Sequence, residues 1–348
     1  MKCKLEGIDI KAITTYLPPK IREMDSLIPV YGKKVVMQTV LGTGIERLHV
    51  AGDEQTTTDM CFEAAEHLIN KEKINRDEID GLVMVSQSFD YLGPASSIIL
   101  QDKLQLSKQT VCFDIIYGCS GYIYGIYQAA MMVSSGTCSN VLLVNGELNT
   151  KLMDDREKDQ VMVFGDCASA TLISKGEGQL TFNIMSDGSR HKAVVNLVNG
   201  FRTPILLKNN EVPLKPDGKP VKAINDGMAV FDFIVHDGKE SISKMLDYMN
   251  WDKGEVDFFA LHQATKVTLD FMRKRLKLDK KKSPFCLQNY GNTSSTTIPL
   301  VLSSYSHSEG IDTSNWKKVI MSGYGIGLSW GSIACNLSNT NIYEPINK

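Results

Sequence analysis

One junction in the sequence, Phe113-Asp-Ile-Ile-Tyr-Gly-Cys-Ser-Gly-Tyr122, joins an apolar strand to the start of a helix. Small and apolar residues then recur at helical spacing, which predicts a tightly packed helix over residues 121–135, with Gly121 and Gly125 one turn apart. Cys119 therefore lies at or next to a helix N-terminus, whose partial positive charge favours a thiolate. Taken alone, Cys119 fits either a nucleophile or a small thiol that fills a tight turn.

Apolar runs typical of buried strands alternate with longer amphipathic helical patterns along the chain. The strands are expected at residues 82–85, 141–144, 161–164, 258–261 and 319–321. The helices are expected at residues 57–71, 121–135 and 227–250. This alternation favours an α/β fold with covered sheets.

The chain also repeats itself at low similarity. The run Asp77-Glu-Ile-Asp-Gly-Leu-Val-Met-Val85 resembles Gly254-Glu-Val-Asp-Phe-Phe-Ala-Leu261, with the matched Glu residues 177 positions apart (255 − 78). The strands expected at 141–144 and 319–321 also match, and their first Val residues are 178 positions apart (319 − 141). We interpret this as a duplication with an N-terminal half over residues 1–175 and a C-terminal half over 176–348. Because no low-complexity linker separates them, the halves should pack as one unit.

A long excursion is expected at about residues 190–225. Prolines, glycines and asparagines are frequent there, with prolines at Pro204, Pro213, Pro216 and Pro220. Long irregular segments in compact proteins are commonly functional, and we interpret this one as a cap over a pocket.

Composition limits the classes of function. Of the 348 residues, 43% are hydrophobic and 22% charged, and the net charge is −2, as in a globular protein with no preference for nucleic acid or an anionic membrane. The N-terminus lacks the long apolar core of a signal peptide, and no window approaches the roughly 18 apolar residues of a membrane span. The eight cysteines show no CxxC pair or zinc spacing, which favours reduced thiols in the cytoplasm and no metal site.

Three further segments could carry chemistry. His262 ends the apolar run Phe258-Phe-Ala-Leu261, at a sheet edge where α/β proteins place sites, although a core histidine is the plainer reading. Asn292 lies in Gly291-Asn-Thr293, which alone indicates only a loop. The run Ser322-Gly-Tyr-Gly-Ile-Gly-Leu-Ser-Trp-Gly-Ser332 predicts a tight turn between strands, where a backbone N–H could bind an oxyanion.

Together these segments resemble the β-ketoacyl-acyl-carrier-protein synthase III family in order and spacing. The matching motifs are Gly-Cys-Ser-Gly around Cys119, His-Gln-Ala from His262, Gly-Asn-Thr-Ser around Asn292 and the C-terminal glycine turn, with Thr43-Gly-Ile45 and Phe164-Gly-Asp166. The resemblance covers nearly the whole chain. It implies a thiolase fold with two duplicated halves in five layers, α-β-α-β-α, and a homodimer.

The resemblance also implies roles. Cys119 would take an acyl group from a thioester, and His262 and Asn292 would hydrogen-bond a malonyl thioester as it loses carbon dioxide. The resulting carbanion would attack the acyl group on Cys119, with the backbone N–H groups of Cys119 and Ile326 as the oxyanion hole. Substrates would be thioesters of coenzyme A or of the phosphopantetheine of acyl carrier protein, with no bound cofactor or metal.

Some positions depart from the family pattern. A Trp and an Arg that usually hold the coenzyme A nucleotide are replaced by Gln38 and Gly42, and an Asn that commonly follows His-Gln-Ala is Thr265. We therefore expect an acyl donor other than a simple short acyl-CoA, either bound to a carrier protein or an unusual CoA ester.

A basic run follows the helix expected after His262. It comprises Arg273-Lys-Arg275, Lys277 and Lys280-Lys-Lys282. It fits either a solvated helix end or a docking patch for acidic acyl carrier protein, and the resemblance supports docking at Lys274 and Arg275.

Three functions are compatible with these residues. The leading one is a decarboxylating condensing enzyme, an acyltransferase of the 3-oxoacyl-[acyl-carrier-protein] synthase III type. The alternative passes the acyl group from Cys119 to a hydroxyl or amine, and the third is a non-catalytic partner subunit. Thiolases use a second catalytic cysteine in the C-terminal glycine turn and elongating synthases a His in place of Asn292, so both are disfavoured.

Overall fold

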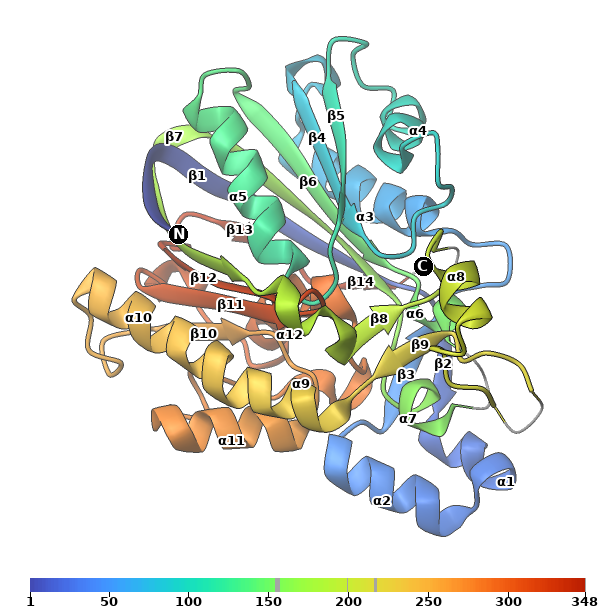
Figure 1. Ribbon diagram of the computed structural model, residues 1–348. Helices are drawn as coiled ribbons and strands as arrows, with labels where there is room; N and C mark the ends of the chain where they lie inside the picture. Colours follow the sequence, from blue (N-terminus) through green and yellow to red (C-terminus); the bar gives the residue numbers. More distant parts are fainter. Residues whose placement is uncertain (154–156, 199, 216–217, 348) are drawn as a thin grey trace.

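The computed structural model describes residues 1–153, 157–198, 200–215 and 218–347. The main strands follow the order β10-β11-β12-β7-β6-β4-β5, and β1 pairs along β7 (Figure 1). Their bounds are β1 Lys2–Leu17, β4 Gly81–Ser86, β5 Val111–Ile116, β6 Asn140–Glu147, β7 Cys167–Ser186, β10 Phe258–Leu261, β11 Val319–Gly325 and β12 Ser329–Cys335.

The same strand pairing occurs twice. Strand β4 pairs in parallel with β6, and β6 pairs antiparallel with β7. Likewise β10 pairs in parallel with β11, and β11 antiparallel with β12. Helix α5 (Gly121–Ser134) precedes β6 as α12 (Thr297–Ser308) precedes β11. Residue 175, the expected boundary, lies inside β7, which pairs with β6 before it and with β12 after it. The division into two halves therefore stays a prediction, since one strand belongs to both.

Alternating strand residues build the layers. In both repeats of the strand pairing, one face of the strands packs on the central helices α5 and α12, through Val83, Val85, Val141, Leu143, Phe258, Ala260, Val319 and Met321. The opposite faces carry Leu82, Met84, Leu142 and Val144 against α3 (Thr57–Glu72), and Phe259, Leu261 and Ile320 against α10 (Lys239–Met249) and α11 (Lys266–Leu276). The two repeats of the sheet form the two β layers, with α5 and α12 between them and α3, α10 and α11 outside, which gives the five layers expected and covers the strands as in other α/β proteins.

The expected helices are confirmed. Helix α3 begins with a capping box in which Thr56 and Asp59 exchange hydrogen bonds, a common device for satisfying free N–H groups at a helix start. The pattern at 227–250 is one continuous helical rod made of α9 (Gly227–Phe233), the π-helical turn η4 (Ile234–Gly238) and α10. It ends at Asn250, which adopts φ 52°.

The strand expected at 161–164 is wrong. Helix α7 (Lys158–Val161) ends there, and only Phe164 forms an isolated bridge, with Asn292. The apolar character comes from Met162, which is buried in a small cluster with Leu48 and Leu287. A short apolar run does not by its periodicity distinguish a strand from a buried turn.

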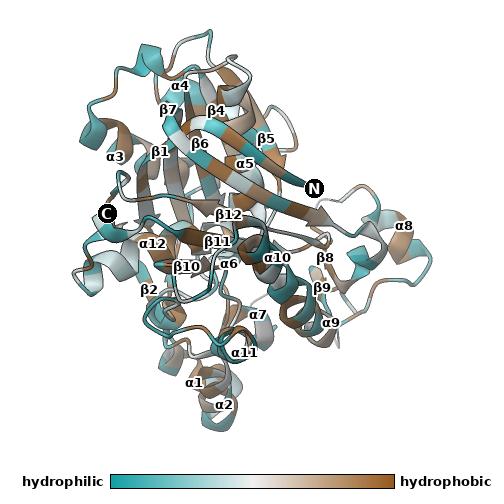
Figure 2. Cartoon of the chain, turned by 90° about the vertical axis from the view of Figure 1, so that its left-hand side faces the viewer, coloured by the Kyte–Doolittle hydropathy of each residue, from teal (hydrophilic) through white to brown (hydrophobic). Residues whose placement is uncertain are grey.

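The excursion at 190–225 has structure of its own. It contains η3 (Gly188–Ala193), β8 (Val194–Asn196), α8 (Thr203–Lys208) and β9 (Ala223–Asn225), and β8 pairs with β9. Pro216 lies outside the described residues. In the side view of Figure 2, α8 projects from the body of the molecule while the β8–β9 ribbon stays close to it.

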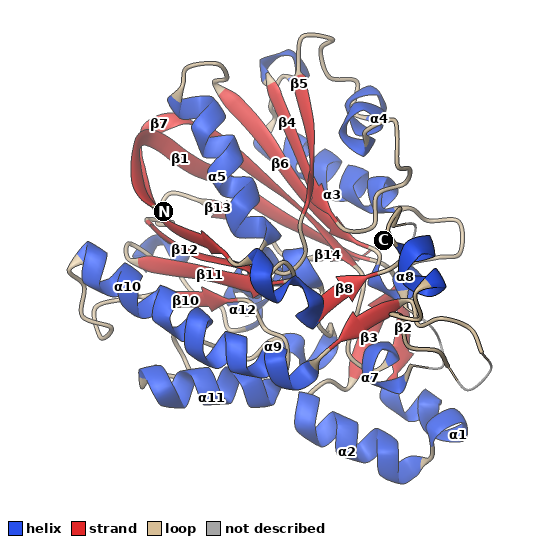
Figure 3. Ribbon diagram, viewed as in Figure 1, coloured by secondary structure: helices blue, strands red, loops and turns tan. Residues whose placement is uncertain are grey.

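Shorter elements complete the described chain (Figure 3). They are β2 Lys20–Glu23, η1 Met24–Leu27, α1 Ile28–Tyr31, α2 Lys33–Thr43, β3 Arg47–Val50, η2 Arg76–Glu78, α4 Ser96–Lys103, α6 Asn149–Leu152, η5 Leu287–Asn289, η6 Ser294–Thr296, η7 Thr313–Asn315, β13 Asn341–Ile342 and β14 Ile346–Asn347. Among the described helices, none combines the length and the apolar character needed to cross a bilayer.

Candidate active site

A single pocket brings together the three residues singled out in the sequence. Cys119, His262 and Asn292 all line it, and the cap contributes Asn196 from β8 and Ile224 from β9 to its wall. The cap expected over a pocket is therefore confirmed.

Cys119 lies on the turn between β5 and α5. The following Ser120 is tied to β12 by a hydrogen bond of 2.6 Å between its Oγ and that of Ser329. Behind the cysteine, Gly325 leaves no room for a side chain, because a Cβ there would lie 2.8 Å from Cys119 Cβ. The Cys119 side chain is partly exposed to the pocket, so a bound thioester could reach Sγ.

The ionisation expected for Cys119 needs correction. Burial raises the pKa of the thiol to about 12, and the negative charge of nearby Glu147 adds to this, while a hydrogen bond with Ser294 opposes it. The residue keeps partial exposure through the pocket, but the pocket wall is largely apolar and does not hydrate the sulfur as bulk water would. Desolvation thus outweighs the helix N-terminus, and the resting nucleophile is a thiol that must lose its proton when it reacts.

His262 is held by its backbone at the end of β10. Its N–H donates to Ser322 O at 2.8 Å, and Tyr324 Oη donates to its carbonyl oxygen at 2.6 Å. Burial lowers the pKa of His262 to about 3, and the Ser294 backbone opposes this shift without outweighing it. The ring is therefore neutral near pH 7, and its Nδ1 is buried without a partner among the described residues. A neutral imidazole has one N–H to donate to a substrate oxygen.

Asn292 is positioned from both sides of its peptide. Its N–H donates to Val163 O at 2.8 Å, and its carbonyl oxygen accepts from Gly165 N at 3.2 Å. Its side-chain Oδ1 accepts from Ser294 N at 2.9 Å, which fixes the orientation of the amide. Since no described residue accepts a hydrogen bond from Nδ2, that group is available to a ligand in the pocket.

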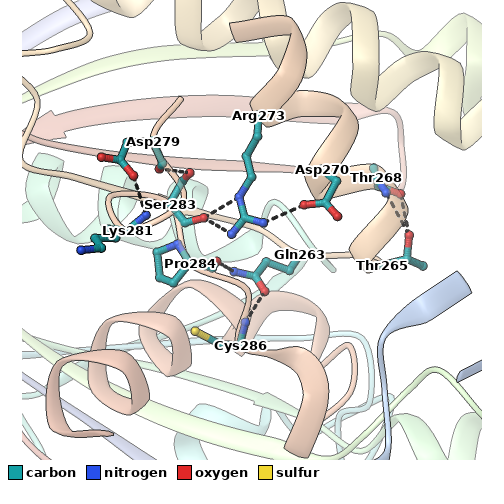
Figure 4. Close-up of polar contacts among 10 residues, drawn as sticks. All are labelled: Gln263, Thr265, Thr268, Asp270, Arg273, Asp279, Lys281, Ser283, Pro284 and Cys286. Atoms are coloured by element: carbon teal, nitrogen blue, oxygen red, sulfur yellow. Dashed lines mark hydrogen bonds and ion pairs between the residues drawn. The ribbon is translucent and has the colours of Figure 1, made fainter. Parts of the chain in front are cut away.

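Gln263 is a positioning residue that the sequence reasoning missed. Its Nε2 donates to Pro284 O at 2.8 Å and its Oε1 accepts from Cys286 N at 2.9 Å (Figure 4). The side chain is buried and joins the strand end that carries His262 to the segment that leads to Asn292. The motif His-Gln-Ala contains this residue, but nothing local in it indicates which backbone the amide binds.

Comparison with known proteins identifies the family of this chain. The 3-Oxoacyl-[acyl-carrier-protein (ACP)] synthase III family profile matches residues 113–188, and the profile of the C-terminal part of 3-Oxoacyl-[acyl-carrier-protein (ACP)] synthase III matches residues 246–337. The β-ketoacyl-[acyl-carrier-protein] synthase III of Clostridium perfringens is 33% identical over 85% of this chain and 89% of its own, and that of Streptococcus sanguinis is 30% identical over 84% and 87%. This chain belongs to the β-ketoacyl-acyl-carrier-protein synthase III family.

Solved structures agree with this assignment. The crystal structure of 3-oxoacyl-(acyl-carrier protein) synthase from Burkholderia xenovorans LB400 superposes with a TM-score of 0.92 at 27% identity, covering 100% of this chain and 99% of that one. The expected thiolase fold is therefore confirmed, and the protein is an enzyme of the synthase III class.

Positions that depart from the synthase III pattern lie on the surface of α2 and at the start of α11. Gln38 is exposed, and a Cβ added at Gly42 would meet nothing within 4 Å, so this face of α2 carries no ring or guanidinium there. Thr265 caps α11, with Oγ1 accepting from Thr268 N at 3.2 Å. The choice of an acyl donor other than a short acyl-CoA stays a prediction.

The basic run divides into buried and exposed members. Arg273 is buried, donates from Nε to Ser283 O at 2.7 Å and pairs with Asp270 (Figure 4). It therefore stabilises the fold and is not part of an exposed docking surface. Lys274 and Arg275 are exposed, and the Arg275 guanidinium lies 4.9 Å from the centre of the Phe271 ring. A docking role for the two exposed residues stays a prediction.

Proposed function

We propose that Cys119, His262 and Asn292 carry out the synthase III reaction, in which acyl transfer to Cys119 precedes a decarboxylating condensation with a malonyl thioester. The observation that supports this most is the shared pocket in which a partly exposed thiol faces two neutral donors, the His262 ring and Asn292 Nδ2. Neutral donors suit an enolate, because they stabilise its oxygen without being able to protonate its carbon at neutral pH.

The steps follow from these groups. Cys119 Sγ attacks the acyl thioester carbon, and the donor thiol leaves. Malonyl thioester then places its carbonyl oxygen at His262 and Asn292, loses carbon dioxide, and its carbanion attacks the acyl carbon on Cys119. We propose the backbone N–H groups of Cys119 and Ile326 as oxyanion donors, since both residues line the pocket and no described carbonyl accepts from either N–H. Chemistry of this kind needs thioesters of coenzyme A or phosphopantetheine, and no metal.

An assay with acyl-loaded enzyme and malonyl carrier protein tests this function. Condensation predicts one carbon dioxide released for each acyl group that leaves Cys119 and a product longer by two carbons. The alternative, transfer to a hydroxyl or amine, predicts loss of the acyl group to that acceptor without carbon dioxide. Replacing carrier-protein donors with acetyl-CoA in the loading step tests the donor: because α2 lacks a nucleotide clamp at Gln38 and Gly42, we expect slow loading from acetyl-CoA.

The exposed pair Lys274 and Arg275 supports a proposed contact with acidic acyl carrier protein. We expect the double variant Lys274→Glu/Arg275→Glu to raise KM for carrier-protein thioesters several-fold and to flatten its dependence on salt, because surface charges act mainly on encounter. Loading from a pantetheine thioester should not change. Lys108→Glu, another exposed lysine, is the control. An equal loss with pantetheine and carrier-protein donors would contradict docking at this pair.

Strand β5 supports a proposed homodimer. It ends the sheet, so one of its edges is unpaired, and it exposes Phe113 to 45% and Ile116 to 76%. Unprotected apolar edge strands pair with other chains, and closed twofold dimers are the commonest result. We expect Phe113→Glu to shift the mass measured by light scattering from two chains to one. Leu41→Glu on α2, a residue that is 82% exposed, should leave two chains. A wild-type mass of one chain would refute the dimer.

We also propose a cytoplasmic location. All eight cysteines are free thiols in the structure, including the buried Cys61, Cys138, Cys167 and Cys335. Reduced thiols in this number fit a reducing compartment.

A further inference from the structure

A buried carboxyl group lies beside the nucleophile and has no part in the reaction described so far. Glu147 is the last residue of β6 and is fully buried, and β6 packs against η6, which carries Ser294. Its Oε2 accepts one long hydrogen bond, 3.4 Å from Gln87 N, and its Oε1 has no partner among the described residues. Burying a carboxyl group that has only one long hydrogen bond is costly, so such a group calls for a role beyond packing.

Ser294 lies close to both this carboxyl group and the sulfur. Its Oγ lies 3.6 Å from Cys119 Sγ, within the range for a hydrogen bond to sulfur. Its backbone adopts φ 54°, an uncommon conformation for a serine. Conformations of this kind persist where the surrounding structure imposes them, and they cluster at functional sites. The hydroxyls of Ser294 and Ser295 both lie near enough to Glu147 to lower its pKa. Neither hydroxyl makes a hydrogen bond to the carboxyl group in this structure: Ser294 Oγ pairs with Cys119 Sγ, and Ser295 Oγ has no partner among the described residues.

The groups around Glu147 set how readily it takes up a proton. Burial raises its pKa to about 8, and Ser295, the Gln87 backbone and Ser294 oppose this shift. The titratable side chains that face it are Cys119 at the start of α5 and Cys61 on α3, whose pKa is raised well above its usual value. Across the pocket His262 is neutral from pH 6 upward. Glu147 is therefore the group at this end of the pocket that changes charge near neutral pH.

We propose that Glu147 receives, through Ser294 Oγ, the proton that Cys119 loses when its sulfur attacks a thioester. Ser294 touches the reacting sulfur, whereas Glu147 is a positioning residue that acts through it. The inference rests on the proposed function for the role of Cys119 as the acylated group.

The step balances in protons and electron pairs. The S–H bond of Cys119 breaks as its electron pair forms the S–C bond to the acyl carbon. Ser294 Oγ accepts this proton and passes its own to the Glu147 carboxylate. When the bond between the acyl carbon and the donor sulfur breaks, the departing thiolate takes up a proton that Glu147 returns by the same route.

The test measures alkylation of Cys119 by iodoacetamide as a function of pH, read by peptide mass spectrometry. With Glu147 as acceptor, the wild-type alkylation rate should rise with the fraction of Glu147 that is carboxylate and level off above about pH 8. The pKa read from this profile belongs to Glu147 and Cys119 together, because the two groups titrate as a coupled pair. If Cys119 simply ionised without an acceptor, the alkylation rate would instead rise tenfold per pH unit up to the pKa of the thiol, about 12. Glu147→Gln should remove the plateau and slow alkylation at pH 8 by about 100-fold or more, the lower end of what general bases contribute.

Two serine variants keep the test decisive if Glu147→Gln folds poorly. Ser294→Gly removes the hydroxyl at a φ that glycine adopts freely, and it should lose the plateau as well. Ser295→Ala is the matched control: it should keep the plateau and move it to higher pH, because Ser295 opposes the raised pKa of Glu147. A plateau that persists in Glu147→Gln or Ser294→Gly, or that disappears in Ser295→Ala, overturns the proposal. Since iodoacetamide is not a thioester, failure of the synthase reaction would be seen separately, as absence of acyl loading.

Discussion

Replacing Cys119 with Ala should abolish acyl loading of the protein. Intact mass spectrometry after incubation with acyl-CoA and acyl-carrier-protein thioesters should show a mass gain for the wild type and none for Cys119→Ala. Turnover should fall by at least about 10⁴-fold, since removal of a covalent nucleophile costs this much or more in other enzymes. The fold should persist, because the change removes one sulfur atom from a side chain that already opens on the pocket.

The same variant separates the two half-reactions. His262 and Asn292 remain in place in Cys119→Ala, so malonyl carrier protein should still bind and release carbon dioxide slowly, without a condensation product. Cys112→Ala on β5 is the matched control and should load normally, because Cys112 does not line the pocket. A mass gain that survives in Cys119→Ala would place the acyl group on another residue and refute the proposed nucleophile.

Much of the layered core could be predicted because its strands are continuous apolar runs. Residues 258–261 are β10, and the runs at 82–85, 141–144 and 319–321 lie inside β4, β6 and β11. The long strands β1 and β7 were not predicted, because β7 buries polar residues such as Ser169 and Thr171 beside its apolar ones. Period alone does not identify a strand that buries polar side chains among its apolar ones.

The site was predicted as a set of residues but not as an arrangement. Motifs placed Cys119, His262 and Asn292 at strand ends and turns, and the fold brings those ends together. The thiol state of Cys119 could not be predicted, because desolvation depends on which apolar walls surround the sulfur. The position of Glu147 could not either: it ends a buried strand in the sequence, and only packing of β6 on η6 brings its carboxyl group near Ser294.

Asn292→Asp should stop condensation while leaving acyl loading intact. In the structure Oδ1 accepts from Ser294 N, and Nδ2 is the group left to donate to a substrate oxygen. An aspartate keeps the first contact with one carboxylate oxygen but places a second oxygen where the donor was. That oxygen cannot donate, and its negative charge opposes the enolate that forms when malonyl thioester loses carbon dioxide. Because loss of one such donor costs about 10²–10³-fold, and the charge adds to it, we expect carbon dioxide release to fall by at least about 100-fold.

Loading and decarboxylation are read in the same sample, by intact mass and by carbon dioxide release from malonyl carrier protein. Asn289→Asp, an exposed residue on η5 in the same turn, should match the wild type in both. Decarboxylation within threefold of the wild type in Asn292→Asp would remove Asn292 from that step and leave His262 as its only side-chain donor. If both loading and decarboxylation were lost, Asn292 would instead act on Cys119 through Ser294. Ser294 contacts Asn292 Oδ1 through its N–H and Cys119 Sγ through its Oγ.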